Sequence, residues 1–269
     1  MSRMGALNLR GGRALIVSTW ASWLQYRSFF FLLAFGWMIP PLIYLFVWSA
    51  AAGQGAVGGL SRSAFVGYYL ALILVNQITY AQTNWTVGDV IRGGGLNTWL
   101  LRPLPPLYHA LASELAGKVV YMAFVVPVAA ALALILRPEL HPAPGAGPLF
   151  LLALGLAWAL RFFWGLWIAL LAFWATRADA LLAVQDALVF LLAGVVAPVA
   201  LLPEYLQRIA VFLPFRYMVG FPVEIMTGQL SGAALRAAFA IQLAWLAATL
   251  GLSLSVWRLG LRRYAAIGG

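Results

Sequence analysis

The chain carries few side chains that could do chemistry, and their spacing argues against the commonest catalytic sites. It has no cysteine, and therefore no disulfide, thiol nucleophile or cysteine-bound metal. The two histidines, His109 and His141, are not spaced as a helical metal-binding pair. The segment ELAGKVV (114–120) contains Gly-Lys, but Ala112 and Val119 replace the first glycine and the hydroxyl residue of a phosphate-binding loop. The sequence therefore predicts no catalytic residue and no metal ligand.

A second group of polar residues is notable because it lies within long apolar runs. Arg161 is near the middle of one run. An arginine at the centre of a membrane helix costs about 2.5–3.5 kcal/mol, so it needs a polar partner or a watery cavity. Asp186 is a partner by charge, but it lies near the end of its own run, at a different depth. One face of an earlier run carries Tyr69, Asn76, Tyr80 and Thr83.

Asn76 and Tyr80 match the depth of Arg161. We therefore predict that Tyr69, Asn76, Tyr80 and Arg161 line an internal translocation path. The alternative is that they only join helices through hydrogen bonds. Pro40-Pro41 and Pro198 interrupt two other runs and predict kinks, which can be hinges or static features.

Membrane-spanning helices must position these residues. The chain is 64% hydrophobic and only 9% charged, which leaves too little polar surface for a soluble globule. A helix needs about 20 mainly apolar residues to cross the hydrocarbon core, and strands of a barrel need about half as many. We predict an all-α polytopic membrane protein. Its six transmembrane helices are expected at about 29–50, 64–85, 118–136, 148–174, 181–202 and 233–257.

The positive charge of the chain indicates its orientation. The formal net charge is +10, and the basic residues are scattered between apolar runs without the stripe that binds nucleic acid. Eleven Lys and Arg, Arg3 and Arg177 among them, lie on the side of both termini and of loop 86–117, five lie on the other side, and Arg161 lies within a span. The positive-inside rule then predicts that both termini and this loop face the cytoplasm.

The predicted organisation has a single membrane domain with short flanking segments. Segment 7–27 mixes arginine with apolar residues and tryptophan, which predicts an N-terminal amphipathic interfacial helix; a tail beside the membrane is the alternative. The predicted parts are a cytoplasmic interfacial leader at 1–28, a six-helix domain at 29–257 that includes the cytoplasmic loop 86–117 and an extracytoplasmic segment 203–232, and a cytoplasmic tail at 258–269.

The loop contains the segment GDVIRGGGLNTWLLRPLPP (88–106). Its three glycines can take positive φ and break a helix, and its prolines fix the exit. Leu96, Trp99, Leu100 and Leu101 supply an apolar face between them. These features predict a short rigid knob, or else an interfacial loop anchored by Trp99 and Arg102.

A second segment, LLPEYLQRIAVFLPFRYMVGFPVEIMTGQL (201–230), follows the fifth run. Pro203 and Pro214 bracket a stretch with Leu206, Ile209 and Leu213 at helical spacing, which predicts a short amphipathic helix. The alternative to a functional role is a helix that only shields the bundle.

The six spans, the leader and these two segments resemble the permease subunit of a bacterial type-2 ABC exporter, and the resemblance covers nearly the whole chain. Many members have a Glu-rich loop start followed by Gly-Thr. This chain has Asp89, Arg92 and three glycines instead, so the acidic contacts are not carried over residue by residue.

The resemblance implies roles for two sets of residues. Loop 86–117 would be a coupling helix that docks on a separate ATPase subunit, through Asp89, Arg92, Gly93, Gly95, Leu96, Trp99, Leu100, Arg102 and Pro103. The second segment would be an extracytoplasmic gate with Pro203, Leu206, Pro214 and Tyr217.

The resemblance also implies partners and a location. It implies two copies of an ABC ATPase, a second permease that is identical or homologous, and membrane lipid, but no nucleic acid. This chain would hold no cofactor and not be an enzyme, with ATP and Mg bound by the partner ATPase. The location would be the bacterial plasma (inner) membrane, and the substrate an amphipathic or hydrophobic drug, antibiotic or lipid-like molecule, or a lipid-linked glycan. A secondary transporter without an ATPase and a membrane-embedded enzyme are the alternatives.

Overall fold

The computed structural model describes residues 9–25, 27–175 and 179–264. Arg3, Arg177, residues 1–8 of the leader and residues 265–269 of the tail lie outside the described residues. The longer helices are α1 (Leu9–Gln25), α2 (Arg27–Ala52), α3 (Arg62–Thr79), α6 (Pro106–Leu136), α7 (Ala146–Leu170), α8 (Asp179–Leu192) and α12 (Gly232–Arg263). The shorter elements are β1 (Ala56–Val57), β2 (Leu60–Ser61), η1 (Asn84–Gly88), α4 (Asp89–Arg92), α5 (Leu96–Leu100), η2 (Leu171–Phe173), η3 (Val199–Leu201), α9 (Glu204–Phe212), α10 (Phe215–Met218) and α11 (Gly220–Met226). The predicted all-α class is confirmed.

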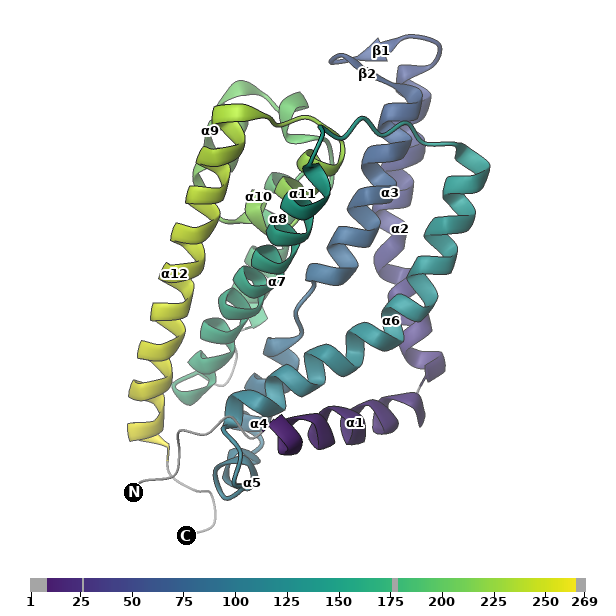
Figure 1. Cartoon of the computed structure of the whole chain (residues 1–269). Coiled ribbons are helices and arrows are strands. Elements are labelled where there is room, and N and C mark those ends of the chain that lie inside the picture. Colours follow the sequence, from purple (N-terminus) through teal and green to yellow (C-terminus); the bar gives the residue numbers. More distant parts are fainter. Residues whose placement is uncertain (1–8, 26, 176–178, 265–269) are drawn as a thin grey trace.

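The long helices form one bundle with two distinct ends. Figure 1 shows α2, α3, α7 and α12 running between these ends, with α6 beside them and bent along its length. Helix α1 lies crosswise at one end, together with α5 and the last turns of α12. The β1–β2 hairpin and α9 lie at the opposite end (Figure 1). The loop 86–105 and the segment around α9 are therefore at opposite ends of the bundle.

Four of the described helices are long and apolar enough to cross a membrane. They include Phe31–Ala52, Pro106–Leu136, Ala146–Phe173 and Gly232–Arg263. The other two predicted spans correspond to α3, with 18 residues, and α8, with 14 residues. The chain is a multi-pass membrane protein, and the number of six spans stays a prediction. Pro40 and Pro41 lie inside α2, which continues through them.

Helix α3 ends earlier than predicted. It begins at the N-cap Ser61, whose hydroxyl accepts a hydrogen bond from Ala64 N at 3.2 Å. The apolar pattern predicted helix to residue 85, but the last helical residue is Thr79 and Tyr80 has an extended ψ of 132°. Thr83 therefore does not share one continuous helical face with Asn76, as predicted.

Helix α8 also ends early, because the chain turns at a glycine. We predicted helix over 181–202, but α8 stops at Leu192 and Gly194 has a φ of +86°. Pro198 then caps the short helix η3. The predicted interruption at this proline is thus the entry to a new short helix and not a kink in a continuous one.

Aromatic donors stabilise this irregular segment after α8. The hydroxyl of Tyr68 donates to Gly194 O at 3.0 Å, and that of Tyr69 donates to Val196 O at 3.0 Å. Trp48 Nε1 donates to the same Val196 carbonyl at 2.7 Å. Buried carbonyls without a partner are costly, so these three side chains make the unwound backbone tolerable within the bundle.

Helix α6 begins about three turns before its predicted start. Pro106 occupies its first turn, where a missing N–H costs nothing, and the helix runs on to Leu136. We predicted a cytoplasmic loop over 86–117 and a span from 118, which separated Glu114 from Lys118. They instead form an ion pair on one helical face, with 3.6 Å between Lys118 Nζ and Glu114 Oε2.

Candidate functional site

The end of α3 is the centre of a polar site inside the bundle. Residues 80–82, which we call the α3 break, are not helical, and η1 begins two residues later. The carbonyls of a last helical turn and the backbone beyond it need partners from elsewhere. Helix α6 supplies partners for this backbone, and α7 contacts the side chains of the last turn of α3.

Helix α6 contacts the break through a stripe of three residues, Glu114, Lys118 and Tyr121, which we call the α6 stripe. Lys118 Nζ donates to Tyr80 O at 2.6 Å, and a Glu114 carboxylate oxygen accepts from the backbone N–H of Gln82. Gln82 Nε2 donates to the hydroxyl of Tyr121 at 2.6 Å. Glu114 is only 3% exposed. Its charge is therefore balanced by Lys118 and its hydrogen bonds instead of by water.

Helix α7 contacts the same region through Arg161. Arg161 Nη1 donates to Asn76 Oδ1 at 2.8 Å and to Thr79 Oγ1 at 3.3 Å. Its guanidinium carbon lies 5.1 Å from the centre of the Tyr80 ring, a cation–π distance. The structure thus brings Asn76, Tyr80 and Arg161 together. Tyr69 lies elsewhere, buried with its hydroxyl on Val196 O.

A cavity of about 250 Å³ opens beside Arg161. It is lined by Gly36, Trp37, Pro40, Pro41, Asn76, Gln77, Tyr80, Arg161, Asp186, Val189, Phe190 and Val195. Asp186 and Arg161 line it together, yet no ion pair joins them among the described residues. The cavity therefore presents an anionic group, a cationic group and the amides of Asn76 and Gln77, and the rest of its wall is aromatic and apolar. It can accommodate a molecule with both polar and apolar parts.

The α6 stripe was not predicted from the sequence. Lys118 was counted only among the eleven basic residues on the side of the termini, and Glu114 was considered only in a failed phosphate-loop match. The spacing of the pair, four residues apart on a helix, was the available signal. A helix start assigned at 118 hid this signal, because it removed Glu114 from the helix.

The loop that follows the break begins with an ion pair and a glycine turn. Arg92 pairs with Asp89 at the surface. Each of the three glycines can take positive φ, and Gly94 does so, at +73°, whereas Gly93 and Gly95 have negative φ. The hydroxyl of Tyr264, after α12, donates to Gly94 O at 3.2 Å. The turn is thus fixed to the end of the last helix.

Replacing Gly94 with valine is expected to destabilise this turn by about 1–2 kcal/mol, because a side chain at positive φ meets the backbone. The measurement is the thermal unfolding of the purified protein. Gly95→Ala is the matched control, since a Cβ at Gly95 meets nothing closer than 3.5 Å. Equal unfolding temperatures for Gly94→Val and the wild type would contradict the expectation.

The apolar residues of the loop divide into an inner and an outer group. Leu96 is fully buried, and the ring of Trp99 stacks on His109 with 4.8 Å between centroids. Leu100 and Leu101 are 42% and 86% exposed. Arg102 and Pro103, which follow them, are also exposed. The predicted single apolar face is therefore wrong: Leu96 and Trp99 anchor the loop, and only Leu100 and Leu101 are presented outward.

The predicted gate residues gather around α9 and α10. Pro203 caps α9, Leu206 is half-buried within it, and Pro214 caps α10. Tyr217 is fully buried, with its hydroxyl donating to Val211 O at 2.7 Å. Its carbonyl accepts a hydrogen bond from Gln242 Nε2 of α12 at 3.1 Å.

The gate region also holds a buried ion pair that the sequence analysis missed. Arg216 donates from Nε and Nη2 to the two carboxylate oxygens of Glu224, at 3.0 and 2.6 Å. Both residues are nearly buried, at 8% and 3% exposure. A bidentate pair of this kind links α10 to α11 with a defined geometry.

The fold is that of a multi-pass membrane protein with a polar cavity inside its helix bundle. The model of the family described as ABC-2 family transporter protein matches residues 37–268. The chain therefore belongs to the ABC-2 transporter family, which confirms the resemblance drawn from its loop and its second segment. It is a transporter permease and not itself a catalyst, and its family works with ABC ATPases in general. No curated protein matched the chain.

Proposed function

We propose that this permease exports an amphipathic or hydrophobic molecule, using ATP hydrolysed on two separate ATPase subunits. A second permease, identical or homologous, completes the translocation path. The main support is one continuous connection: the Arg161 cavity borders the end of α3, the α3 break leads into η1 and α4, and these lead to the exposed Leu100 and Leu101. Movement of the loop would reach the cavity through very few residues.

The proposal includes six spans with both termini in the cytoplasm of a bacterial plasma membrane. Helices α3 and α8 supplement the four long apolar helices. The start of α1 and the end of α12 lie at the same end of the bundle, as an even number of crossings requires (Figure 1). The arginines of the last turns of α12 lie at that end too, in agreement with the positive-inside rule. The segment around α9 would then face outward as a gate.

The decisive experiment reconstitutes the permease with the ATPase that copurifies with it. We expect ATP hydrolysis and ATP-dependent movement of a fluorescent amphiphile in vesicles. Transport that continues with a hydrolysis-deficient ATPase, driven by an ion gradient instead, would support a secondary transporter and contradict the proposal. No ATPase in complexes isolated under mild conditions would contradict it as well.

Replacing Arg161 with methionine is expected to lower transport by about tenfold or more, because the cavity loses its cation and Asn76 and Thr79 lose their donor. The measurement is transport per folded complex. The control is Arg236→Gln, which changes an exposed arginine near the start of α12. If Arg161→Met lowers the unfolding temperature but leaves transport per folded complex unchanged, Arg161 only joins helices and does not line the path.

A further inference from the structure

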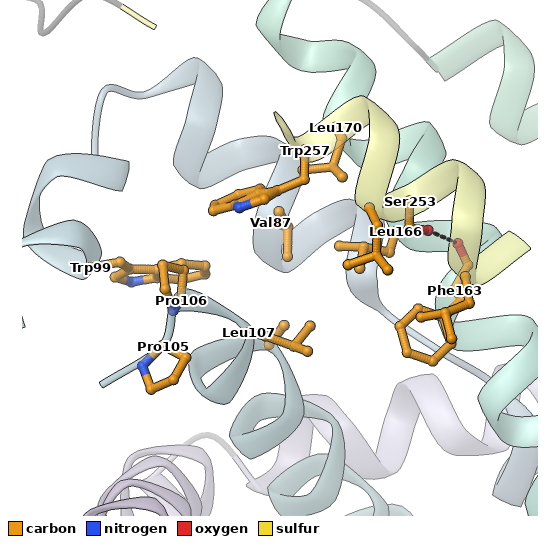
Figure 2. A pocket seen from close by; sticks show the side chains of 13 residues that line it. Val87, Trp99, Pro105, Pro106, Leu107, Phe163, Leu166, Leu170, Ser253 and Trp257 are labelled. Carbon is orange, nitrogen blue, oxygen red and sulfur yellow. Dashed lines mark hydrogen bonds between the residues drawn. The ribbon is translucent and has the colours of Figure 1, made fainter. Parts of the chain in front are cut away.

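An apolar groove lies beside the loop, apart from the Arg161 cavity. It has a volume of about 230 Å³ and is formed by η1, the loop, and helices α6, α7 and α12. Figure 2 shows Trp99, Pro105 and Pro106 on one side and Trp257 of α12 and Leu170 of α7 on another, facing a common space. The groove thus connects the coupling loop with the last helix.

The lining is almost entirely apolar. Its side-chain polar groups are the hydroxyl of Ser253, which donates to Phe163 O at 2.9 Å (Figure 2), and the indole N–H groups of Trp99 and Trp257 at the end nearest the loop. The rest of the wall has no polar group that could hold ordered water. An empty groove of this size would also forfeit the dispersion contacts of all its lining atoms. The occupant must therefore be apolar where it touches the groove.

The groove is open on the side of α12. Leu250 and Leu254, which line it, are 37% and 48% exposed. Both belong to the apolar helix Gly232–Arg263, so this side lies at the level of the bilayer. Trp99 and Trp257 mark the end of the groove nearest the loop, and tryptophan is typical of the membrane–water boundary. A lipid tail can therefore enter from the side.

Positive charge lies at the same end. Arg258 follows Trp257 directly, and Arg262 and Arg263 complete the last turns of α12. All three are exposed, and none forms an ion pair with another described residue. Leu250 lies about 12 Å from Arg258 along the axis of α12, toward the middle of the helix, at 1.5 Å per residue. A phosphate held near Arg258 thus places an acyl chain along Leu254 and Leu250.

We infer that this groove binds one acyl chain of an anionic phospholipid, with its phosphate at Arg258 and Arg262. The lipid comes from the leaflet on the side of the coupling loop. Because Trp99, Pro105 and Pro106 form part of the wall, the bound acyl chain packs against the loop and stabilises its position. This lipid has a structural role beside the loop and is not the transported molecule.

The test uses the full-length permease in nanodiscs, with a phosphatidylglycerol that carries a photoreactive diazirine in its acyl chain. Labelled peptides are mapped by mass spectrometry. We expect labelling of residues 250–257 of α12 and of the loop. Leu254→Trp, which fills the groove, should lower this labelling several-fold. Leu252→Trp is the matched control, because Leu252 is 43% exposed on the same helix but does not line the groove.

The headgroup is tested with Arg258→Gln/Arg262→Gln and with the corresponding phosphatidylcholine probe. The double variant should lower phosphatidylglycerol labelling by about five-fold or more, without affecting phosphatidylcholine labelling, whereas Arg236→Gln should change neither. If Leu254→Trp does not fold, Leu250→Phe replaces it. Labelling spread evenly over the lipid-facing helices, labelling absent from the groove, or equal use of both lipids would overturn the inference. No outcome depends on ATP, so the proposed transport function is tested separately.

Discussion

Changing Leu100 and Leu101 together to aspartate is expected to remove the ATPase from the purified complex and leave the permease folded. Both side chains are exposed apolar groups at the tip of the loop, at 42% and 86% exposure. Aspartate in water there costs the permease little, whereas a charge facing an apolar groove on a partner is costly. Copurified ATPase and ATP-driven transport should both fall at least tenfold. The measurement is the ATPase-to-permease ratio after isolation in mild detergent.

The control is Leu96→Asp, which has the same chemistry in the same loop. Leu96 is fully buried beside Ile91 and Leu170, so its aspartate should unfold the loop and lower the unfolding temperature of the permease itself. The Leu100/Leu101 variant should keep the wild-type unfolding temperature. ATPase binding that survives Leu100→Asp/Leu101→Asp would place the contact elsewhere and reduce the loop to an interfacial anchor.

This contrast shows what the loop sequence could and could not predict. The glycines, the leucines and the prolines indicated a short, stiff element, and the structure has one at α5. Leu96 and Leu101 are chemically identical, however, so local sequence could not separate the buried anchor from the exposed tip. The separation arises because Leu96 belongs to a buried cluster with Leu166 and Leu170 of α7, which are far away in sequence.

The ends of helices were hard to predict for a similar reason. The predicted helices extend beyond Thr79 and Leu192. The sequence stays apolar after Leu192, whereas polar residues follow Thr79 at positions 82–84. Both helices end where a distant side chain donates a hydrogen bond to the freed backbone. Lys118 donates to Tyr80 O, and Tyr68 donates to Gly194 O. Such partners compensate for a lost helix bond inside a membrane protein. A prediction from local pattern cannot include them.

The contact between Arg161 and Asn76 could be predicted because a simple physical constraint applied. A charge deep in a membrane needs a polar partner at the same depth, and few such residues existed in the chain. The same argument gave no result for Glu114, because it pairs with a residue on its own helix. Its burial depends on how α6 meets the α3 break.

Replacing Lys118 with methionine is expected to destabilise the permease by about 3–5 kcal/mol, because it leaves the charge of Glu114 buried and unpaired. It also leaves Tyr80 O without its donor. The double variant Glu114→Gln/Lys118→Met should recover most of this loss, since glutamine is neutral and still accepts from Gln82 N. Thermal unfolding in detergent, calibrated by a denaturant series, measures both variants.

The exposed pair Glu204–Arg208 on α9 provides an internal comparison with the same spacing. Its side chains are both 78% exposed, so Arg208→Met should cost no more than about 1 kcal/mol.

Even where stability is recovered, the Glu114→Gln/Lys118→Met variant should transport poorly, because the α3 break has lost the donor at Tyr80 O that fixes it between the loop and the Arg161 cavity. Full transport by this double variant would show that the α6 stripe stabilises the fold without coupling the loop to the path.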